Sequence, residues 1–298
     1  MTKRHKDGEP QLPHENPDVF RDLIEFTAAR TGFPAHLIEK DYFCSLVLAH
    51  LFGGAGSGEL VFKGGTALNK VHFGFYRLSE DLDFSVPVEL NATRGDRRKG
   101  KAAVEKRILE LTSALPTLSF SEPWTGANNS TQYLAEISYP SVITNVPGRI
   151  KIDTGLREPV LSAAVHEAAC LLLDPITRRE AVGPLQVRTM NVREAMAEKS
   201  RAALARLTPA IRDVFDLWFA REKGALPSDD AEFVSLIKTK LAIPGNAAPS
   251  ASKERRDIFR AQLETDLRPV LRPVDYERFD FNEGWEIIEE IARAVLKE

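Results

Sequence analysis

The sequence predicts an α/β protein in which a mixed sheet flanked by helices is joined to a helical C-terminal half. Three observations support this fold class: a short β-prone run that ends in two glycines at residues 64 and 65, later segments in which apolar and polar residues alternate, and a helical repeat that begins near residue 188. A period of two is typical of strands, and a period of about 3.6 is typical of helices. We expect a flexible tail over residues 1–16, a sheet domain over 17–187 and a helical domain over 188–298.

Composition and charge are those of an ordinary globular protein. Of its 298 residues 28% are charged and 43% are hydrophobic, and the formal net charge is −3. The two cysteines, Cys44 and Cys170, lack the spacing of a disulfide framework or a zinc site. No apolar run approaches the length of a membrane span, and the N-terminus lacks the apolar region of a signal peptide. We therefore expect a cytoplasmic protein with no membrane partner, in which nucleic-acid binding would depend on local basic patches.

Two helices are predicted at the N-terminal end of the sheet domain, over residues 17–30 and 34–52. Asn16 and Pro17 can begin the first helix, and a Thr-Gly-Phe-Pro sequence separates it from the second. The second helix carries Glu39, Lys40 and Asp41. A charged turn on a packing helix is the simpler interpretation, and a role in a site is the alternative for Lys40 and Asp41.

The stretch over residues 60–73 has the form of a phosphate-binding turn. A β-prone apolar run is followed by Lys63 and by Gly64 and Gly65, and a helix-capable segment begins at Thr66. A helix that starts after a tight glycine turn presents backbone N–H groups to an anion, and its dipole favours negative charge there. We therefore expect phosphate to bind at the two glycines.

A second strand is predicted over residues 80–86, with two carboxylates on one face. Asp81 and Asp83 alternate with apolar residues, so the apolar face packs while the carboxylates point to open space. Like charges about 4 Å apart repel by roughly 4 kcal/mol at an effective dielectric constant of about 20. Either one carboxyl group is protonated, or a divalent cation neutralises both. Mg²⁺ is the natural cation, because it takes one or two carboxylates together with substrate phosphates.

The segment after this strand is the most basic in the chain. Arg94, Arg97, Arg98, Lys99 and Lys101 lie in a run without apolar periodicity, and a helix is predicted only from residue 102. A solvated loop is the usual interpretation of such a run. The alternative is contact with an RNA backbone, for which a protein of negative net charge would need a patch of this kind.

Alternation returns in two later segments, residues 132–139 and 149–154. In the second, Ile150 and Ile152 alternate with Lys151 and Asp153. Both segments are therefore predicted strands. Asp153 is either an exposed residue on an edge strand or a third carboxylate beside Asp81 and Asp83, which the sequence alone does not decide.

The C-terminal half is predicted to be helical. A helix over residues 191–206 places Lys199 within a stripe of small apolar residues, either as a side chain that reaches out to water or as a ligand for an anion. The next helix, over residues 209–223, carries Asp213 and Asp216 on its flank. Residues 225–256 are expected to be largely an exposed loop, and two amphipathic helices are expected over 253–267 and 283–297.

The motif KGGTAL followed by RLSEDLDF resembles the AbiEii/AbiGii-type toxins, a bacterial branch of the DNA polymerase β-like nucleotidyltransferases that includes the mycobacterial MenT toxins. Segments resembling further motifs of the family are KID at residues 151–153, EAMAEKSRA at 194–202 and RDVFDL at 212–217. The resemblance implies a nucleotidyltransferase-like sheet and an Mg²⁺-dependent transfer of NMP from an NTP substrate, with Mn²⁺ as a possible substitute.

The resemblance also implies roles for individual residues. It assigns Asp81, Asp83 and Asp153 to the metal and to catalysis, and Lys199 and Asp213 to the catalytic site, with Asp213 preferred over Asp216. The nucleotide is assigned to Lys63, Gly64, Gly65, Thr66, Arg77, Ser79 and Lys199.

The family analogy implies that RNA accepts the nucleotide, at the tRNA 3′ end in the MenT toxins, and that translation is blocked. It also implies a cognate antitoxin, commonly a winged-helix regulator. Three alternatives stay open at this point: transfer to a small hydroxylated molecule, as in aminoglycoside nucleotidyltransferases; transfer to a Tyr or Ser of a partner protein; and an inactive nucleotidyltransferase fold that acts as a binding module.

Overall fold

A seven-stranded mixed sheet forms the centre of the computed structural model, which describes residues 12–53, 59–228 and 230–297. The strand order is β3-β4-β5-β2-β1-β7-β6. Pairs β2–β5 and β1–β7 are parallel and the other neighbours are antiparallel. The strands are β1 (Val61–Lys63), β2 (Leu82–Ser85), β3 (Ser119–Ala127), β4 (Gln132–Tyr139), β5 (Gly148–Gly155), β6 (Ala163–Ala168) and β7 (Leu185–Met190). The predicted fold class is therefore confirmed.

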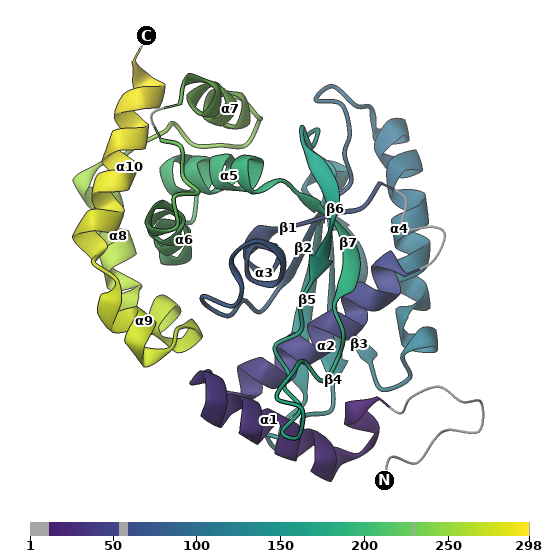
Figure 1. The fold of residues 1–298 in the computed structure, drawn as a ribbon. Coiled ribbons are helices and arrows are strands. Elements are labelled where there is room, and N and C mark those ends of the chain that lie inside the picture. The colour runs from purple at the N-terminus through teal and green to yellow at the C-terminus, as the bar shows by residue number, and fades with distance from the viewer. Residues whose placement is uncertain (1–11, 54–58, 229, 298) are drawn as a thin grey trace.

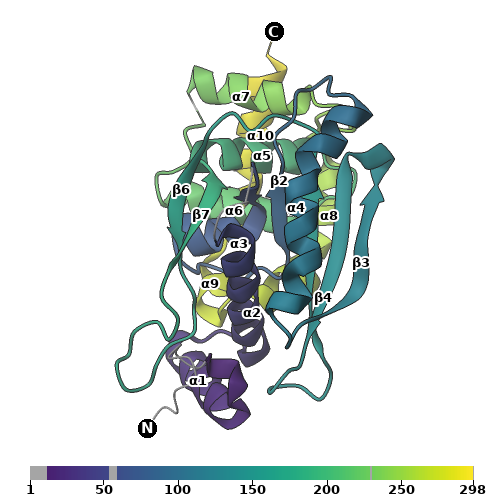
Figure 2. The same cartoon turned by 90° about the vertical axis from the view of Figure 1, so that its right-hand side faces the viewer.

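Helices cover both faces of this sheet (Figure 1). One face carries α2 (Ala35–Phe52) and α4 (Arg94–Ala114), with α1 (Pro17–Thr31) against α2, as Figure 2 shows from the side. The other face carries α3 (Gly64–Ala67), which continues as a π-helical segment (Leu68–Phe73), and then the helical half of the chain. That half consists of α5 (Val192–Ala205), α6 (Ile211–Glu222), α7 (Ala231–Leu241), α8 (Lys253–Ala261), α9 (Pro273–Arg278) and α10 (Phe281–Leu296), with a π-helical segment at Leu263–Leu267.

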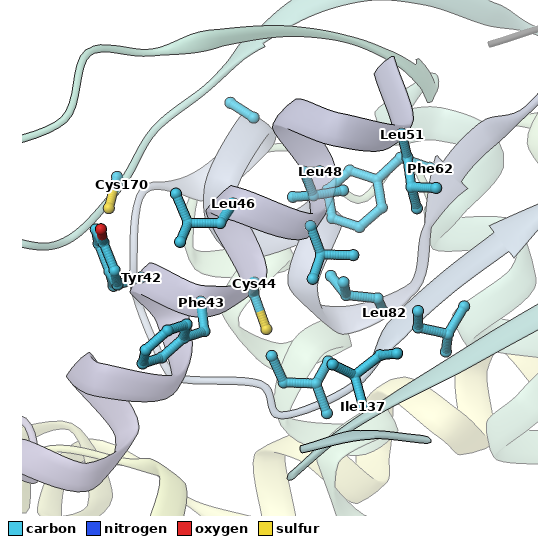
Figure 3. Packing of buried hydrophobic residues seen from close by; sticks show 14 of the residues in the cluster. Tyr42, Phe43, Cys44, Leu46, Leu48, Leu51, Phe62, Leu82, Ile137 and Cys170 are labelled. Atoms are coloured by element: carbon cyan, nitrogen blue, oxygen red, sulfur yellow. The ribbon is translucent and has the colours of Figure 1, made fainter. Parts of the chain in front are cut away.

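Two hydrophobic cores lie on the two sides of the sheet. The first lies between the sheet and α1, α2 and α4, and it contains Phe62 and Leu82 (Figure 3). Ile152 of β5 belongs to the same core. The second holds the helical half together and reaches the sheet through Val61 of β1. Because neighbouring residues of a strand point to opposite faces, the polar residues between these apolar ones face the helical half. The site is therefore confined to the side of α5 and α6.

The structure corrects the prediction of a basic loop. Helix α4 begins at Arg94 rather than near residue 102, because Thr93 and Asp96 form a reciprocal capping box. The Thr93 hydroxyl accepts a hydrogen bond from the Asp96 N–H, and the Asp96 carboxylate accepts one from the Thr93 N–H. The basic residues thus lie on the first turns of a helix.

Other boundaries also differ from the prediction. Strand β2 begins at Leu82, so Asp81 precedes the strand. Helix α7 occupies part of the expected loop over residues 225–256, because Asp230 caps it and the side chains of Phe233 and Ile237 are buried. Strand β7 continues across the expected domain boundary at residues 187 and 188.

The expected N-terminal tail is only partly described. Residues 1–11 lie outside the described part of the chain. Residues 13–15 form a short 3-10 helix, in which the His14 ring makes hydrogen bonds with the Tyr42 hydroxyl at 2.7 Å and with the Thr117 hydroxyl at 3.1 Å. This part of the expected tail is therefore packed on α2. No helix within the described ranges combines the length and the apolar character that crossing a membrane requires.

Candidate active site

Lys63, Asp83 and Asp153 form a row across three adjacent strands. Lys63 is the cross-strand partner of Asp83 in the β1–β2 ladder, and Asp83 is the partner of Asp153 in the parallel β2–β5 ladder. Neighbouring strands lie about 4.8 Å apart, so the two carboxylates stand side by side on the face toward the helical half. The structure thus places Asp153 in a central strand beside Asp83, rather than on an edge strand.

Burial raises the pKa of both carboxyl groups in this row, and repulsion from neighbouring carboxylates adds to it. The pKa of Asp83 rises to about 6, mainly because burial disfavours its charged form and then because Asp153 repels it, while Lys63 opposes the rise. The pKa of Asp153 is also raised, chiefly by burial, although the Gln132 side chain donates a hydrogen bond of 2.7 Å to Oδ2 of Asp153. The charge of Lys63 therefore does not offset the effect of burial on Asp83 and Asp153.

The two glycines leave room for the groups beside them. Gly64 has φ of +74°, and a Cβ at this position would lie 2.1 Å from Oδ2 of Asp83. A Cβ at Gly65 would lie 2.5 Å from Nη2 of Arg77 and 2.8 Å from the Ser79 hydroxyl oxygen. The glycine turn is thus packed between Asp83 on one side and Arg77 and Ser79 on the other.

Replacing Gly64 with alanine should disturb the site and the fold together. The new Cβ would overlap Asp83, and the alanine would have to adopt the positive φ of Gly64. We therefore expect a loss of about 1–3 kcal/mol in the free energy of unfolding and a displaced Asp83 carboxylate. Urea unfolding and nucleotide titration would measure both effects. Gly74→Ala is the matched control, because Gly74 has φ of +64° but no atom within 4 Å of the new Cβ. Equal effects of the two substitutions would contradict the proposed contact.

A buried ionic cluster connects the strand region to α5 and α6. Arg77 donates to both oxygens of Asp216, through Nε at 2.6 Å and Nη2 at 2.9 Å, and the Tyr76 hydroxyl donates to the same carboxylate at 2.6 Å. Lys199 forms ion pairs with Asp216 at 2.8 Å and with Asp213 at 2.7 Å. Although burial opposes it, the charges of Arg77 and Lys199 hold the pKa of Asp216 well below its usual range. The cluster is compact and internally paired.

The predicted nucleotide ligands therefore differ in what the structure leaves available. Arg77 is 1% exposed and committed to Asp216, and the buried Thr66 donates its hydroxyl to the main-chain carbonyl of Asp81. Lys199 retains 15% exposure of its side chain. Ser79 and Asp81 are half-buried beside the glycine turn. Arg77 and Thr66 thus stabilise the glycine turn and the residues just before β2. Sequence spacing does not distinguish this role from direct binding of nucleotide.

A cavity of about 600 Å³ opens between the sheet and the helical half, beside the row. This volume lies within the range of small-molecule sites. Sequence reasoning identified Lys63, Asp83 and Asp153 in its lining and missed its other polar residues. These include Asn128, Gln132, Arg157, Glu158, Arg201, Arg206, Thr208 and Asn246. For Arg201 a signal was available, because it lies in the EAMAEKSRA segment, two residues after Lys199.

Lys40 and Asp41 have structural partners. Asp41 forms an ion pair of 2.8 Å with the buried Lys70, and Lys40 pairs with Glu80 at 3.0 Å. The Glu39 carboxylate accepts hydrogen bonds of 2.6 Å from the Ser141 hydroxyl and the Val142 N–H. Glu39 is 1% exposed, so its expected place on a solvated turn is wrong.

The basic residues of α4 do not line the cavity. Arg94, Arg98 and Lys99 are exposed. Lys101 lies over the Tyr133 ring, with its Nζ 4.8 Å from the ring centroid. Arg97 donates a hydrogen bond of 2.6 Å to the carbonyl of Ala92. Three of the five predicted RNA contacts are thus open to solvent, and the other two have partners within the protein.

Asp83 and Asp153 fit a hard divalent cation. Within the described ranges, no three His, Cys, Asp or Glu side chains are arranged as a complete metal-binding group. Mg²⁺ does not require one, because it commonly keeps water and phosphate oxygens and takes only one or two carboxylates. Burial is the main cause of the raised pKa of both carboxyl groups, and a bound cation would stabilise their charged forms.

Comparisons with known proteins identify the family of the chain and relate its fold to solved structures. The family described as "Nucleotidyl transferase AbiEii toxin, Type IV TA system" matches residues 47–288. The nucleotidyltransferase toxin MenT4 of Mycobacterium tuberculosis is 18% identical, with a TM-score of 0.51 over 92% of this chain and 97% of that one. JHP933 of Helicobacter pylori is 16% identical, with a TM-score of 0.51 over 88% of this chain and 93% of that one. At these identities the two structures show a shared fold. No curated protein sequence matches significantly.

Proposed function

The chain belongs to the AbiEii family of nucleotidyl transferase toxins, and on that premise we propose that it moves NMP from an NTP to the 3′ end of tRNA and thereby blocks translation. The observation that carries the proposal is the register of β2 and β5, which places Asp83 beside Asp153 at the Gly64-Gly65 turn. The family is one of type IV toxin–antitoxin systems, so a cognate antitoxin accompanies its members. We propose a winged-helix regulator as that antitoxin.

Each residue of the site has a role in this reaction. Asp83 and Asp153, with Asp81 just before β2, would hold Mg²⁺ or Mn²⁺, which when bound would offset the negative charge of the triphosphate. Backbone N–H groups at Gly64 and Gly65 and the Ser79 hydroxyl would hold phosphate oxygens. These groups position the α-phosphorus for attack by the acceptor hydroxyl, so catalysis depends mainly on orientation and electrostatics.

Charge and proton transfer fall to the remaining side chains. Lys63 lies next to Asp83 in the row and would offset charge that develops on the leaving pyrophosphate. Gln132 donates a hydrogen bond to Oδ2 of Asp153, so Oδ1 would either hold the cation or accept the proton of the attacking hydroxyl. Lys199, with Asp213 as its partner, would add positive charge at the triphosphate.

Transfer of label tests the function directly. The purified protein would be incubated with total bacterial tRNA, Mg²⁺ and each α-labelled nucleoside triphosphate in turn, beside the Asp83→Asn variant. Label in tRNA from the wild type alone is the expected result, and it would identify the acceptor and the base together. Label in a co-expressed protein or in a small hydroxylated molecule, with none in RNA, would overturn the RNA assignment.

Metal binding should weaken as the pH falls below about 6. Asp83 has a pKa raised to about 6, so below that value a cation must displace its proton, and affinity should fall by about tenfold for each pH unit. Calorimetric titration of Mn²⁺ in the presence of a non-hydrolysable NTP would show this dependence between about pH 5 and pH 8. In Asp83→Asn the dependence should become shallower. An affinity of the wild type that does not vary with pH would argue against Asp83 as a ligand.

A further inference from the structure

Three arginines face the cavity without a close carboxylate of their own. Arg157 follows β5, while Arg201 and Arg206 lie on and just after α5. Arg157 is 3.8 Å from Glu158 and Arg206 is 3.7 Å from Asp213. In the described part of the chain, no carboxylate lies within 4.0 Å of Arg201.

The carboxylates of Glu158 and Asp213 each lie closer to a lysine than to these arginines. Asp213 pairs with Lys199 at 2.7 Å, and Glu158 pairs with Lys240 at 3.4 Å. In the described part of the chain, none of the three guanidinium groups therefore has a carboxylate closer than 3.7 Å, although Asp83, Asp153 and Glu158 line the same cavity. Guanidinium groups bind phosphate through planar pairs of N–H donors, so the cavity is suited to a phosphate-bearing ligand.

Arg201 is held in place before any ligand arrives. Its Nη1 donates a hydrogen bond of 2.8 Å to Oδ1 of Asn246. The Nδ2 of Asn246 in turn donates to three backbone carbonyls at the end of α7, those of Lys240, Leu241 and Ile243, at 2.9–3.1 Å. Asn246 therefore has a defined orientation, and a guanidinium group held in this way loses little freedom when it binds.

The position of the arginines indicates whether they would bind a phosphate of the NTP or one of the acceptor. Asp83 contacts the Gly64 turn on one side and lines the cavity on the other, while Gly64, Gly65 and Ser79 are absent from the cavity lining. If the triphosphate occupies the glycine turn, in-line displacement requires the acceptor to approach from the opposite side of the α-phosphorus. An acceptor in the arginine-lined cavity, on the side of Asp83 away from the Gly64 turn, would approach from that side.

We propose that Arg157, Arg201 and Arg206 bind the phosphodiester backbone of the acceptor strand next to its terminal hydroxyl. This inference rests on the proposed function and deepens it, because it makes the acceptor an anion. A polycationic acceptor of the aminoglycoside kind is repelled by the same three side chains. A neutral hydroxyl of a protein gains nothing from them.

Separate binding measurements test this assignment. Arg157→Ala and Arg201→Ala would be titrated with a single-stranded RNA that ends in a 3′ hydroxyl and with a non-hydrolysable NTP in the presence of Mg²⁺. We expect RNA affinity to fall by about tenfold and the slope of its salt dependence to lessen by about 0.7 per arginine removed, with NTP affinity unchanged. Arg268→Ala is the matched control, since Arg268 is 63% exposed and pairs only with Glu264 in the described part of the chain. Arg201→Lys and the melting temperature separate loss of contact from misfolding.

Each other result counts against the proposal. A fall in NTP affinity with unchanged RNA affinity would assign the arginines to the triphosphate. Unchanged affinity for both ligands would remove them from the site altogether. A wild-type protein that binds RNA through these arginines but transfers no label would leave the site standing and overturn the proposed function. A wild type that binds neither ligand would overturn both.

Discussion

Replacing Asp83 with asparagine is expected to reduce nucleotidyl transfer by about 10²–10³-fold or more while leaving the fold at least as stable. Asp83 lies between Lys63 and Asp153 in the row and beside Gly64. The amide has the shape of the carboxylate but lacks the charge that a cation on the triphosphate requires. Single-turnover transfer of labelled nucleotide would measure the loss.

The stability of this variant provides an independent check. Folding raises the pKa of Asp83 to about 6, so the ionised group is less favourable in the folded chain than in the unfolded one. The wild type therefore loses stability as the pH rises from about 4 to about 6, and at neutral pH the asparagine variant avoids that loss. Asp22→Asn on the exposed side of α1 is the control. Full activity, or a melting temperature several degrees lower, would contradict the assignment of Asp83.

Replacing Asp216 with alanine is expected to lower the free energy of unfolding by about 3–5 kcal/mol. Asp216 is fully buried, and its removal leaves Arg77, which is 1% exposed, without the carboxylate that satisfies two of its donors. Tyr76 loses its acceptor as well. Urea unfolding at neutral pH would measure the change.

A neighbouring aspartate gives the comparison for this result. Asp213→Ala leaves Lys199 paired with Asp216 at 2.8 Å, so we expect a loss of about 1–2 kcal/mol. The lowered pKa of Asp216 adds a pH test: its contribution is present above its unfolded pKa of about 3.8 and is lost as the pH falls further. Equal losses for the two variants would show that the Arg77–Asp216 pair does not dominate the cluster.

Local patterns in the sequence predict the elements that carry the row. Alternation of Leu82 and Phe84 with Asp83 is enough to place the carboxylate away from the core, and Ile150 and Ile152 do the same for Asp153. Each pattern is local, and burial of one face fixes the orientation of the strand. The sequence therefore predicts which side chains are available to a site, and the structure shows that these two strands are neighbours.

Local sequence patterns could not predict contacts between residues that are distant in sequence. Arg77 has the same spacing to Ser79 whether it binds nucleotide or a buried carboxylate, and only the packing of α6 shows that Asp216 occupies it. The same applies to Arg157 and Arg201, which are distant in sequence but line one cavity. The start of α4 is different, because the capping residues Thr93 and Asp96 were a readable signal that the basic composition obscured.

The long sequence separation between the members of the site has a consequence for synthesis on the ribosome. β2 cannot gain its parallel neighbour until β5 has emerged, and Arg77 has no buried counter-ion until Asp216 has followed. Contacts between distant segments form late and slowly, and domains complete folding only when their last required segment is available. A nascent chain of this toxin should therefore remain inert until most of it has left the ribosome.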